Sequence, residues 1–110
     1  MSDRFTEETR AGFSVGDVVE HRLFGYRGVI VDVDPTFQLS DEWYEEVARS
    51  RPPKDSPWYH VLVQDSDAAR YVAEQNLALD PSGQPVRNAA LRDFFDDFVQ
   101  GRYVRSAPAN

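Results

Sequence analysis

The segment from His21 to Phe37 restricts the fold more than any other part of the chain. It reads His-Arg-Leu-Phe-Gly-Tyr-Arg-Gly-Val-Ile-Val-Asp-Val-Asp-Pro-Thr-Phe. A turn signal at Phe24-Gly25 precedes a run rich in β-branched residues, which suit a half-buried pleated surface, so we expect a strand over 26–33. Pro35 lacks an N–H and disfavours helical backbone in the residue before it, which ends the strand. Residues 18–22 have the length of the hairpin partner.

Two further segments show strand character after this hairpin. Residues 58–65 alternate between two faces, and residues 70–73 follow a turn at Asp65-Ser66-Asp67. Four or five short strands with tight turns and no βαβ spacing favour a small, strongly bent antiparallel sheet. An SH3-like barrel is the simplest closure of such a sheet. The predicted fold class is therefore mainly β.

Two helices are predicted outside the sheet. The first is a helical insertion over about 40–49, which begins at the N-cap Ser40 and has two carboxylates in its first turn. The second is an amphipathic C-terminal helix over about 89–100, capped by Asn88 and stopped by Gly101. Its apolar side chains recur at helical spacing, and they are Leu91, Phe94, Phe95, Phe98 and Val99.

Length and composition favour one barrel domain over residues 13–103. A chain of 110 residues with 41% hydrophobic content can bury a core without covalent staples. Residues 1–12 are expected to form a mobile tail, and residues 104–110 a loose one. The chain has no cysteine, which excludes disulfides and thiolate ligands. No apolar run approaches the ~20 residues of a membrane-spanning helix, and no signal peptide is recognisable, so we expect a cytoplasmic protein.

No group of residues predicts catalysis, a metal or a cofactor. The two histidines, His21 and His60, lie on different expected strands, and a zinc site needs at least three protein ligands. Hydrogen bonding at the sheet edge explains each imidazole more simply. Asp32 and Asp34 alternate on one strand and are expected to form cross-strand ion pairs with the hairpin arginines. With no nucleophile motif or glycine-rich phosphate loop, we expect no enzyme activity.

Cations and aromatic rings gather at the hairpin tip and after the predicted insertion. Such mixtures occur at nucleic-acid contacts and at protein–protein hot spots, although solvated arginines beside a turn explain each residue alone equally well. The net charge of −7 gives a field that repels DNA and favours protein partners. The candidate contact residues are His21, Arg22, Phe24, Tyr26, Arg27, Arg49, Arg51 and Lys54.

The side chains of the hairpin are expected to divide into two groups. Val29, Val31 and Val33 are assigned to the core. Arg22 and Arg27 are expected to be exposed, so replacing both with Ala should weaken partner binding and leave the fold intact. Large aromatic residues are assigned to the core as well, and these are Trp43, Trp58 and Tyr59.

Three blocks of the sequence carry a family resemblance. They read His-Arg-Leu-Phe-Gly-Tyr-Arg-Gly-Val-Ile-Val-Asp-Val-Asp-Pro at 21–35, Pro-Trp-Tyr-His-Val-Leu-Val at 57–63 and Tyr-Val-Ala-Glu-Gln-Asn-Leu at 71–77. In this order they resemble the heat-shock protein HspQ family, also called the YccV-like or hemimethylated DNA-binding domain family. The resemblance covers roughly residues 13–79 and implies a small SH3-like β-barrel without catalytic residues.

The resemblance also implies two activities and self-association, with trimers among the expected states. One activity is protein quality control, in which a heat-induced member modulates a Lon-type ATP-dependent protease and is its substrate. The other is binding of hemimethylated origin DNA in the control of replication initiation. Because the chain is acidic, our first hypothesis is a non-enzymatic regulator or adaptor that modulates degradation of client proteins by the protease. The DNA-binding module is the second hypothesis, and a structural oligomeric module is the third.

Overall fold

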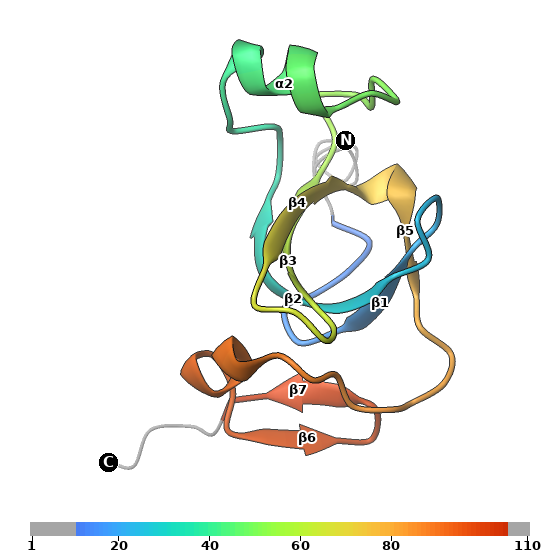
Figure 1. Ribbon diagram of the computed structural model, residues 1–110, viewed down its shortest axis with the longest axis vertical. Coiled ribbons are helices and arrows are strands. Elements are labelled where there is room, and N and C mark those ends of the chain that lie inside the picture. Colours follow the sequence, from blue (N-terminus) through green and yellow to red (C-terminus); the bar gives the residue numbers. More distant parts are fainter. Residues whose placement is uncertain (1–10, 106–110) are drawn as a thin grey trace, which may run out of the picture.

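A five-stranded antiparallel sheet forms the centre of the computed structural model, which describes residues 11–105. The strands are β1 (Val18–His21), β2 (Arg27–Asp34), β3 (Trp58–Val63), β4 (Ala69–Ala73) and β5 (Leu77–Leu79). They pair in the order β4-β3-β2-β1-β5, and Figure 1 shows the sheet curling into an open barrel. The mainly β prediction is confirmed. The tails expected at 1–12 and 104–110 lie outside the described residues, except for 11–12 and 104–105.

The hairpin of β1 and β2 forms where the sequence predicts it. Val18 lies opposite Val29, and the turn closes with a hydrogen bond from His21 N–H to Tyr26 O at 2.8 Å. Gly25 in this turn has φ +80°, a left-handed conformation that glycine adopts without steric cost. Gly28 is required for another reason, since a Cβ there would lie 2.6 Å from the Leu62 carbonyl oxygen on β3.

A β-bulge between Ile30 and Asp32 changes which face of β2 each side chain reaches. Val29 and Val31 pack toward the C-terminal segment, whereas Ile30 and Val33 pack inside the barrel. A bulge places two residues opposite one and so breaks the strict alternation of a strand. The three valines expected in the core all contact it, but they belong to two separate clusters.

The predicted insertion carries the helix α2 (Asp41–Val47), and its N-cap is confirmed. Ser40 Oγ accepts a hydrogen bond from Trp43 N–H at 3.1 Å. The insertion covers the outer face of β3 and β4 with an aromatic cluster, where Trp58 is 1% exposed and donates its indole N–H to Pro53 O at 3.0 Å. The cluster consists of Phe37, Trp43, Tyr44, Trp58 and Tyr71, with Ala48 and Ala73.

The prediction of an amphipathic helix over 89–100 is wrong. A 3-10 helix (Ala89–Asp93) is followed by a hairpin of β6 (Asp97–Val99) and β7 (Arg102–Val104). Gln100 and Gly101 have φ of +52° and +83°, and two consecutive left-handed residues match a type I′ hairpin turn. Asn88 still caps the 3-10 helix, its side chain accepting from Ala90 N–H.

The C-terminal segment packs on its own barrel, on the side opposite α2 (Figure 1). Arg102 forms an ion pair with Asp17 at 3.1 Å, and Tyr103 N–H donates to Gly16 O at 2.8 Å. The Tyr103 hydroxyl accepts from Val86 N–H at 2.8 Å and donates to Val86 O at 3.1 Å. Of the apolar residues that suggested a helix, Leu91 and Phe95 are buried, Phe94 and Phe98 pack against the same cluster, and Val99 stays 44% exposed. Within residues 11–105 no helix has the length and apolar character needed to span a membrane.

Candidate functional site

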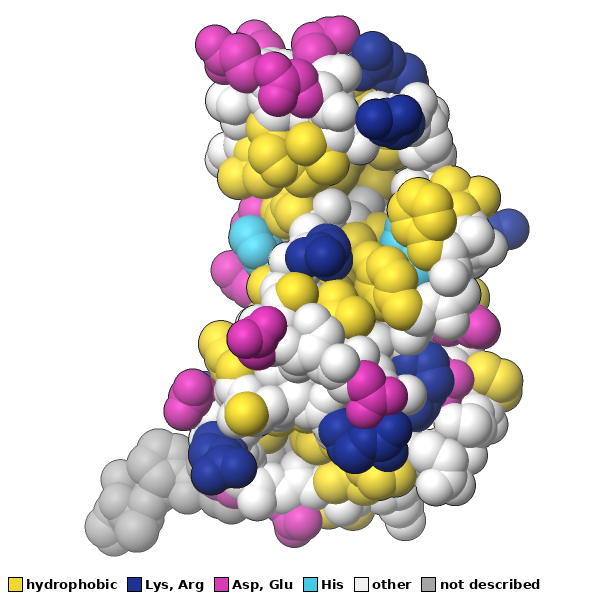
Figure 2. Space-filling model, viewed as in Figure 1, with side chains coloured by type: hydrophobic (Ala, Val, Ile, Leu, Met, Phe, Trp, Pro, Cys, Tyr) yellow, Lys and Arg dark blue, Asp and Glu magenta, His cyan; other side chains and the backbone are white. Residues whose placement is uncertain are grey.

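A groove of about 580 Å³ runs along β4, between the α2 insertion and the β1–β2 turn, and we call it the β4 groove. Figure 2 shows hydrophobic side chains gathered on this face, with a few cationic side chains among them. The groove has two aromatic walls, a base formed by β4 and one end closed by polar side chains. The first wall is Trp43, Trp58 and Tyr71, the second is His21, Phe24 and Tyr26, the base is Arg70, Val72 and Ala73, and the end is Arg49, Ser50 and Asn76.

The first wall is a stack of aromatic rings held to the sheet by Tyr71. Tyr71 stacks on Trp58 with ring centroids 5.1 Å apart and meets Trp43 edge-to-face at 5.7 Å. The Tyr71 hydroxyl donates to Asp34 Oδ2 at 2.7 Å and accepts from Gln38 N–H at 3.1 Å. Burial raises the pKa of Tyr71, and the hydrogen bond to the Asp34 carboxylate raises it further. The hydroxyl therefore stays protonated and holds the wall in place.

The second wall is built around His21, which is 5% exposed. Its Nδ1 accepts hydrogen bonds from Leu23 N–H and Phe24 N–H, both at 3.1 Å. Its ring stacks on Phe24 at 4.6 Å and lies 5.0 Å from Tyr26. Burial lowers the pKa of His21, which agrees with a neutral ring whose Nδ1 is an acceptor. Phe24 is 77% exposed, so this wall presents a large apolar surface to solvent.

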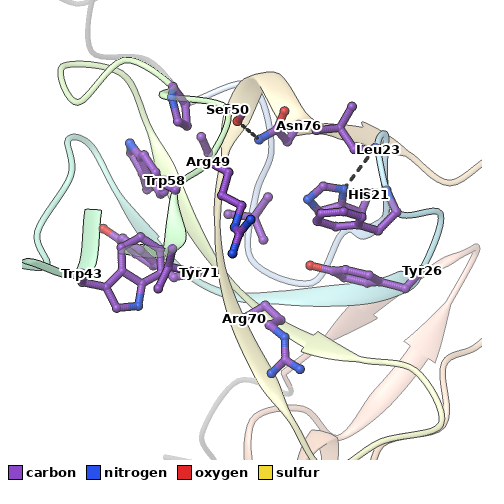
Figure 3. A pocket seen from close by; sticks show the side chains of 16 residues that line it. His21, Leu23, Tyr26, Trp43, Arg49, Ser50, Trp58, Arg70, Tyr71 and Asn76 are labelled. Carbon is purple, nitrogen blue, oxygen red and sulfur yellow. Dashed lines mark hydrogen bonds between the residues drawn. The ribbon is translucent and has the colours of Figure 1, made fainter. Parts of the chain in front are cut away.

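Two arginines supply positive charge inside the groove. Figure 3 shows Arg49 and Arg70 between the Trp43–Tyr71 side and the His21–Tyr26 side. In the described part of the chain neither arginine forms an ion pair. Arg70 and Tyr26 line the same groove; burial raises the pKa of Tyr26, and the charge of Arg70 partly opposes that rise. The groove therefore combines aromatic surface with available positive charge in an acidic protein.

Half of the predicted contact residues line the groove, namely His21, Phe24, Tyr26 and Arg49. Arg22 lies beside it and donates to Gln75 O at 3.1 Å. Arg51 pairs with Glu45 at 3.2 Å. Lys54 pairs with Asp41 at 3.1 Å and lies 4.4 Å from the centre of the Tyr44 ring. Arg51 and Lys54 therefore both form ion pairs with acidic residues of α2, whereas Arg49 forms none among the described residues.

Arg27 contradicts the expectation that it is exposed, since only 19% of its side chain is accessible. Its guanidinium donates to Gln64 Oε1 at 2.8 Å, to Asp80 Oδ2 at 3.1 Å and to Gln84 O at 2.6 Å. We call this set the Arg27 clamp. Burial alone would raise the pKa of Asp80, but hydrogen bonds from Ser82 and Arg27 and the charge of Arg27 outweigh it and hold the pKa low. Arg27 thus fastens the segment after β5 to β2.

Sequence reasoning missed Arg70 and Tyr71 and assigned Trp43 and Trp58 to the core alone. Trp58 is buried as expected, yet both tryptophans border the groove. One signal for Arg70 was present, a cation beside a tyrosine on a short strand that follows a turn. The groove itself is assembled from three separate segments, so no local pattern could show it.

A separate group of ligand-type side chains lies on β2 and β3. Single ligand atoms of Asp32, Asp34 and His60 fall within 4.8 Å of one another, and such side chains are able to bind a divalent cation. Asp34 does not pair with a hairpin arginine as expected. It pairs with His60 Nε2 at 3.3 Å and accepts from Tyr71, which links this group to the first wall of the groove.

Comparison with protein families gives one further finding. The chain matches the family model YccV-like, described as "Hemimethylated DNA-binding protein YccV like", over residues 11–102. The match includes both walls of the groove, the Arg27 clamp and most of the C-terminal hairpin.

Proposed function

Because the chain belongs to the YccV-like family, which is described by binding and not by catalysis, we propose that it is a non-enzymatic regulator or adaptor in protein quality control. In this proposal the β4 groove binds segments of client proteins and modulates their degradation by a Lon-type ATP-dependent protease during heat stress. The observation that carries the proposal is the aromatic groove, with the 77% exposed Phe24 at its margin, on an acidic protein.

The chemistry of the groove suits protein segments. Aromatic residues and arginine dominate the binding energy of protein interfaces because they bury large areas in defined orientations. Unfolded or partly folded clients expose apolar side chains, and each buried Å² of apolar surface contributes roughly 25 cal/mol. The net charge of −7 does not oppose such a partner, whereas it opposes a nucleic acid.

A degradation assay tests this function. A client protein is incubated with purified Lon-type protease, with and without this protein, and the rate of client loss is measured. We expect the wild-type chain to change that rate, and a Phe24→Ala/Trp43→Ala variant to lose the effect. Leu79→Ala is the matched control, because Leu79 is 58% exposed on β5 and does not line the groove. An equal effect from the groove variant and the wild type would overturn the proposal.

Binding of hemimethylated DNA is the second candidate, favoured by the family description together with Arg49 and Arg70 beside aromatic rings. Filter binding with hemimethylated, unmethylated and fully methylated duplexes over a range of salt concentrations tests it. Each neutralised phosphate contributes a slope of about −0.9 to the plot of log affinity against log salt. With two groove arginines we expect a shallow slope of about −2 if DNA binds here. A preference for the hemimethylated duplex that disappears in Arg49→Ala/Arg70→Ala would replace the first proposal.

Self-association is a separate proposal and is compatible with either function. A solution mass measurement by sedimentation decides whether the chain is a monomer or a trimer. A trimer that has no effect on the protease and no affinity for DNA would leave the structural oligomeric module as the function.

A further inference from the structure

Strand β4 has one edge that no other strand covers within residues 11–105. Its ladder with β3 includes the hydrogen bond from Glu74 N–H to Pro57 O, which fixes the alternation of the pairing. By that alternation the backbone groups of Arg70 and Val72 face β3. The N–H and C=O of Tyr71, between them, point to the open side. An uncovered edge of this kind is a template for another strand.

The β4 groove lies along this open edge. Arg70, Tyr71, Val72 and Ala73 line the groove in sequence, and Figure 3 shows side chains from both walls on either side of β4. The other edge of the sheet, β5, also directs a backbone amide outward, that of Leu79, because Asp80 N–H bonds to Val18 O on β1. Leu79 does not line the groove. The two edges therefore differ in their surroundings and not in their backbone chemistry.

We propose that an extended segment of a partner protein adds to β4 as a further strand, and that its acidic and apolar side chains alternate. This inference rests on the proposed function and specifies how a protein segment binds in the groove, namely as an extended strand paired with β4. Side chains opposite each other on neighbouring strands project to the same face. A partner residue opposite Tyr71 faces the first aromatic wall, and its neighbours, opposite Arg70 and Val72, face the other side. Apolar side chains suit the first position, and carboxylates suit the position beside Arg70.

Backbone chemistry selects a peptide over a nucleic acid, and the charge of the groove selects an acidic peptide. Arg49 and Arg70 have no carboxylate partner in the described part of the chain, so an acidic segment supplies the missing countercharge. The open edge at Tyr71 offers both an N–H donor and a C=O acceptor. A peptide backbone carries the complementary pair, whereas a phosphodiester backbone has acceptors and no donor.

The test uses a synthetic peptide, acetyl-Glu-Val-Glu-Ile-Glu-Val-Glu-amide, and the full-length protein. Affinity is measured by calorimetry, and amide hydrogen exchange is measured by NMR with and without peptide. We expect exchange of the Tyr71 amide to slow at least tenfold at saturation, with the Leu79 amide unchanged. A peptide of the same composition with acidic and apolar residues in two blocks should bind at least fivefold more weakly. Arg49→Glu/Arg70→Glu should reduce affinity at least tenfold, and its native spectrum confirms folding.

Each result decides a different point. Binding with no slowing at Tyr71 would show that the groove holds side chains without strand addition, and would overturn this inference while the degradation assay still supports the proposed function. No binding at millimolar peptide would overturn it as well. If the hemimethylated duplex slows Tyr71 exchange and the peptide does not, the occupant is a nucleic acid and the inference is wrong. Equal binding of the alternating and block peptides would contradict the proposal that acidic and apolar side chains alternate in the partner segment.

Discussion

Arg27 lies on β2 and Arg70 on β4 of the same sheet, with β3 between them, and the two guanidinium groups have opposite surroundings. Arg27 is 19% exposed and donates to Asp80, Gln64 and the backbone of the segment after β5. Arg70 is exposed, and within residues 11–105 its side chain donates one hydrogen bond, to the neighbouring carbonyl of Ala69 at 3.1 Å. The segment after β5 brings Asp80 to Arg27 and neutralises its charge, whereas no acidic segment reaches Arg70 in the part of the chain that the structure describes. The charge of Arg70 is therefore the one that a partner can use.

The largest effect expected from this comparison is on the stability of the Arg27 clamp. Arg27→Ala leaves the Asp80 carboxylate, 6% exposed, without its main cation. Breaking a buried ion pair from one side is strongly destabilising, so we expect the free energy of unfolding to fall by about 2–4 kcal/mol. Urea denaturation followed by circular dichroism measures it. A loss below about 0.5 kcal/mol would mean that the clamp contributes nothing, and that the two arginines do not differ in role.

The sequence predicts the parts of the fold that local chemistry determines. The β1–β2 turn needs a left-handed glycine at Gly25, and the α2 insertion has a capping residue in Ser40, so both were recognised. The prediction of a C-terminal helix was wrong because apolar residues at helical spacing also fit a 3-10 helix followed by a hairpin that packs on the barrel. The left-handed turn at Gln100 and Gly101 and the contacts with Gly16 and Val86 decide between the two, and these contacts are distant in sequence.

The candidate site was only half predictable for the same physical reason. His21, Phe24 and Tyr26 lie in one turn, so their shared composition was visible. Arg27 pairs with Asp80, which lies 53 residues further along the chain, so its neutralisation could not be inferred from its neighbours. Arg70 belongs to the candidate site because the β1–β2 turn and the α2 insertion form walls beside it, and no local pattern around Arg70 predicts that arrangement.

A smaller loss of stability is expected from a change in the second wall of the groove, where the buried group is the imidazole of His21. His21→Leu removes the acceptor of two backbone N–H groups, those of Leu23 and Phe24. Unsatisfied buried donors cost about 1–3 kcal/mol, and partial exposure of this turn places the expected loss near 1 kcal/mol. Thermal unfolding measures it, with His60→Gln as the control for the other histidine. A stability equal to that of the wild type would show that solvent replaces these hydrogen bonds.

The same histidine should make stability depend on pH. Burial lowers the pKa of His21 below its ordinary value of 6.5, so the unfolded chain binds the proton more readily than the folded one. The contribution to stability is present above pH 6.5 and is lost as the pH falls toward the folded-state pKa. We expect the free energy of unfolding to decrease between pH 7 and pH 5.5, and the decrease to be smaller in His21→Leu. An identical slope in both proteins would assign the pH dependence to other groups.

The smallest effect on stability is expected at Arg70, which completes the comparison. Arg70→Ala removes an exposed side chain without an ion pair in the described residues, so the free energy of unfolding should change by less than about 0.5 kcal/mol. The affinity for the alternating peptide should nevertheless fall several-fold, because Arg70 supplies countercharge at the open edge of β4. Urea denaturation and calorimetry on the same sample separate the two quantities. A loss of more than 1 kcal/mol would make Arg70 a structural residue like Arg27, and the positive charge of the groove would then rest on Arg49 alone.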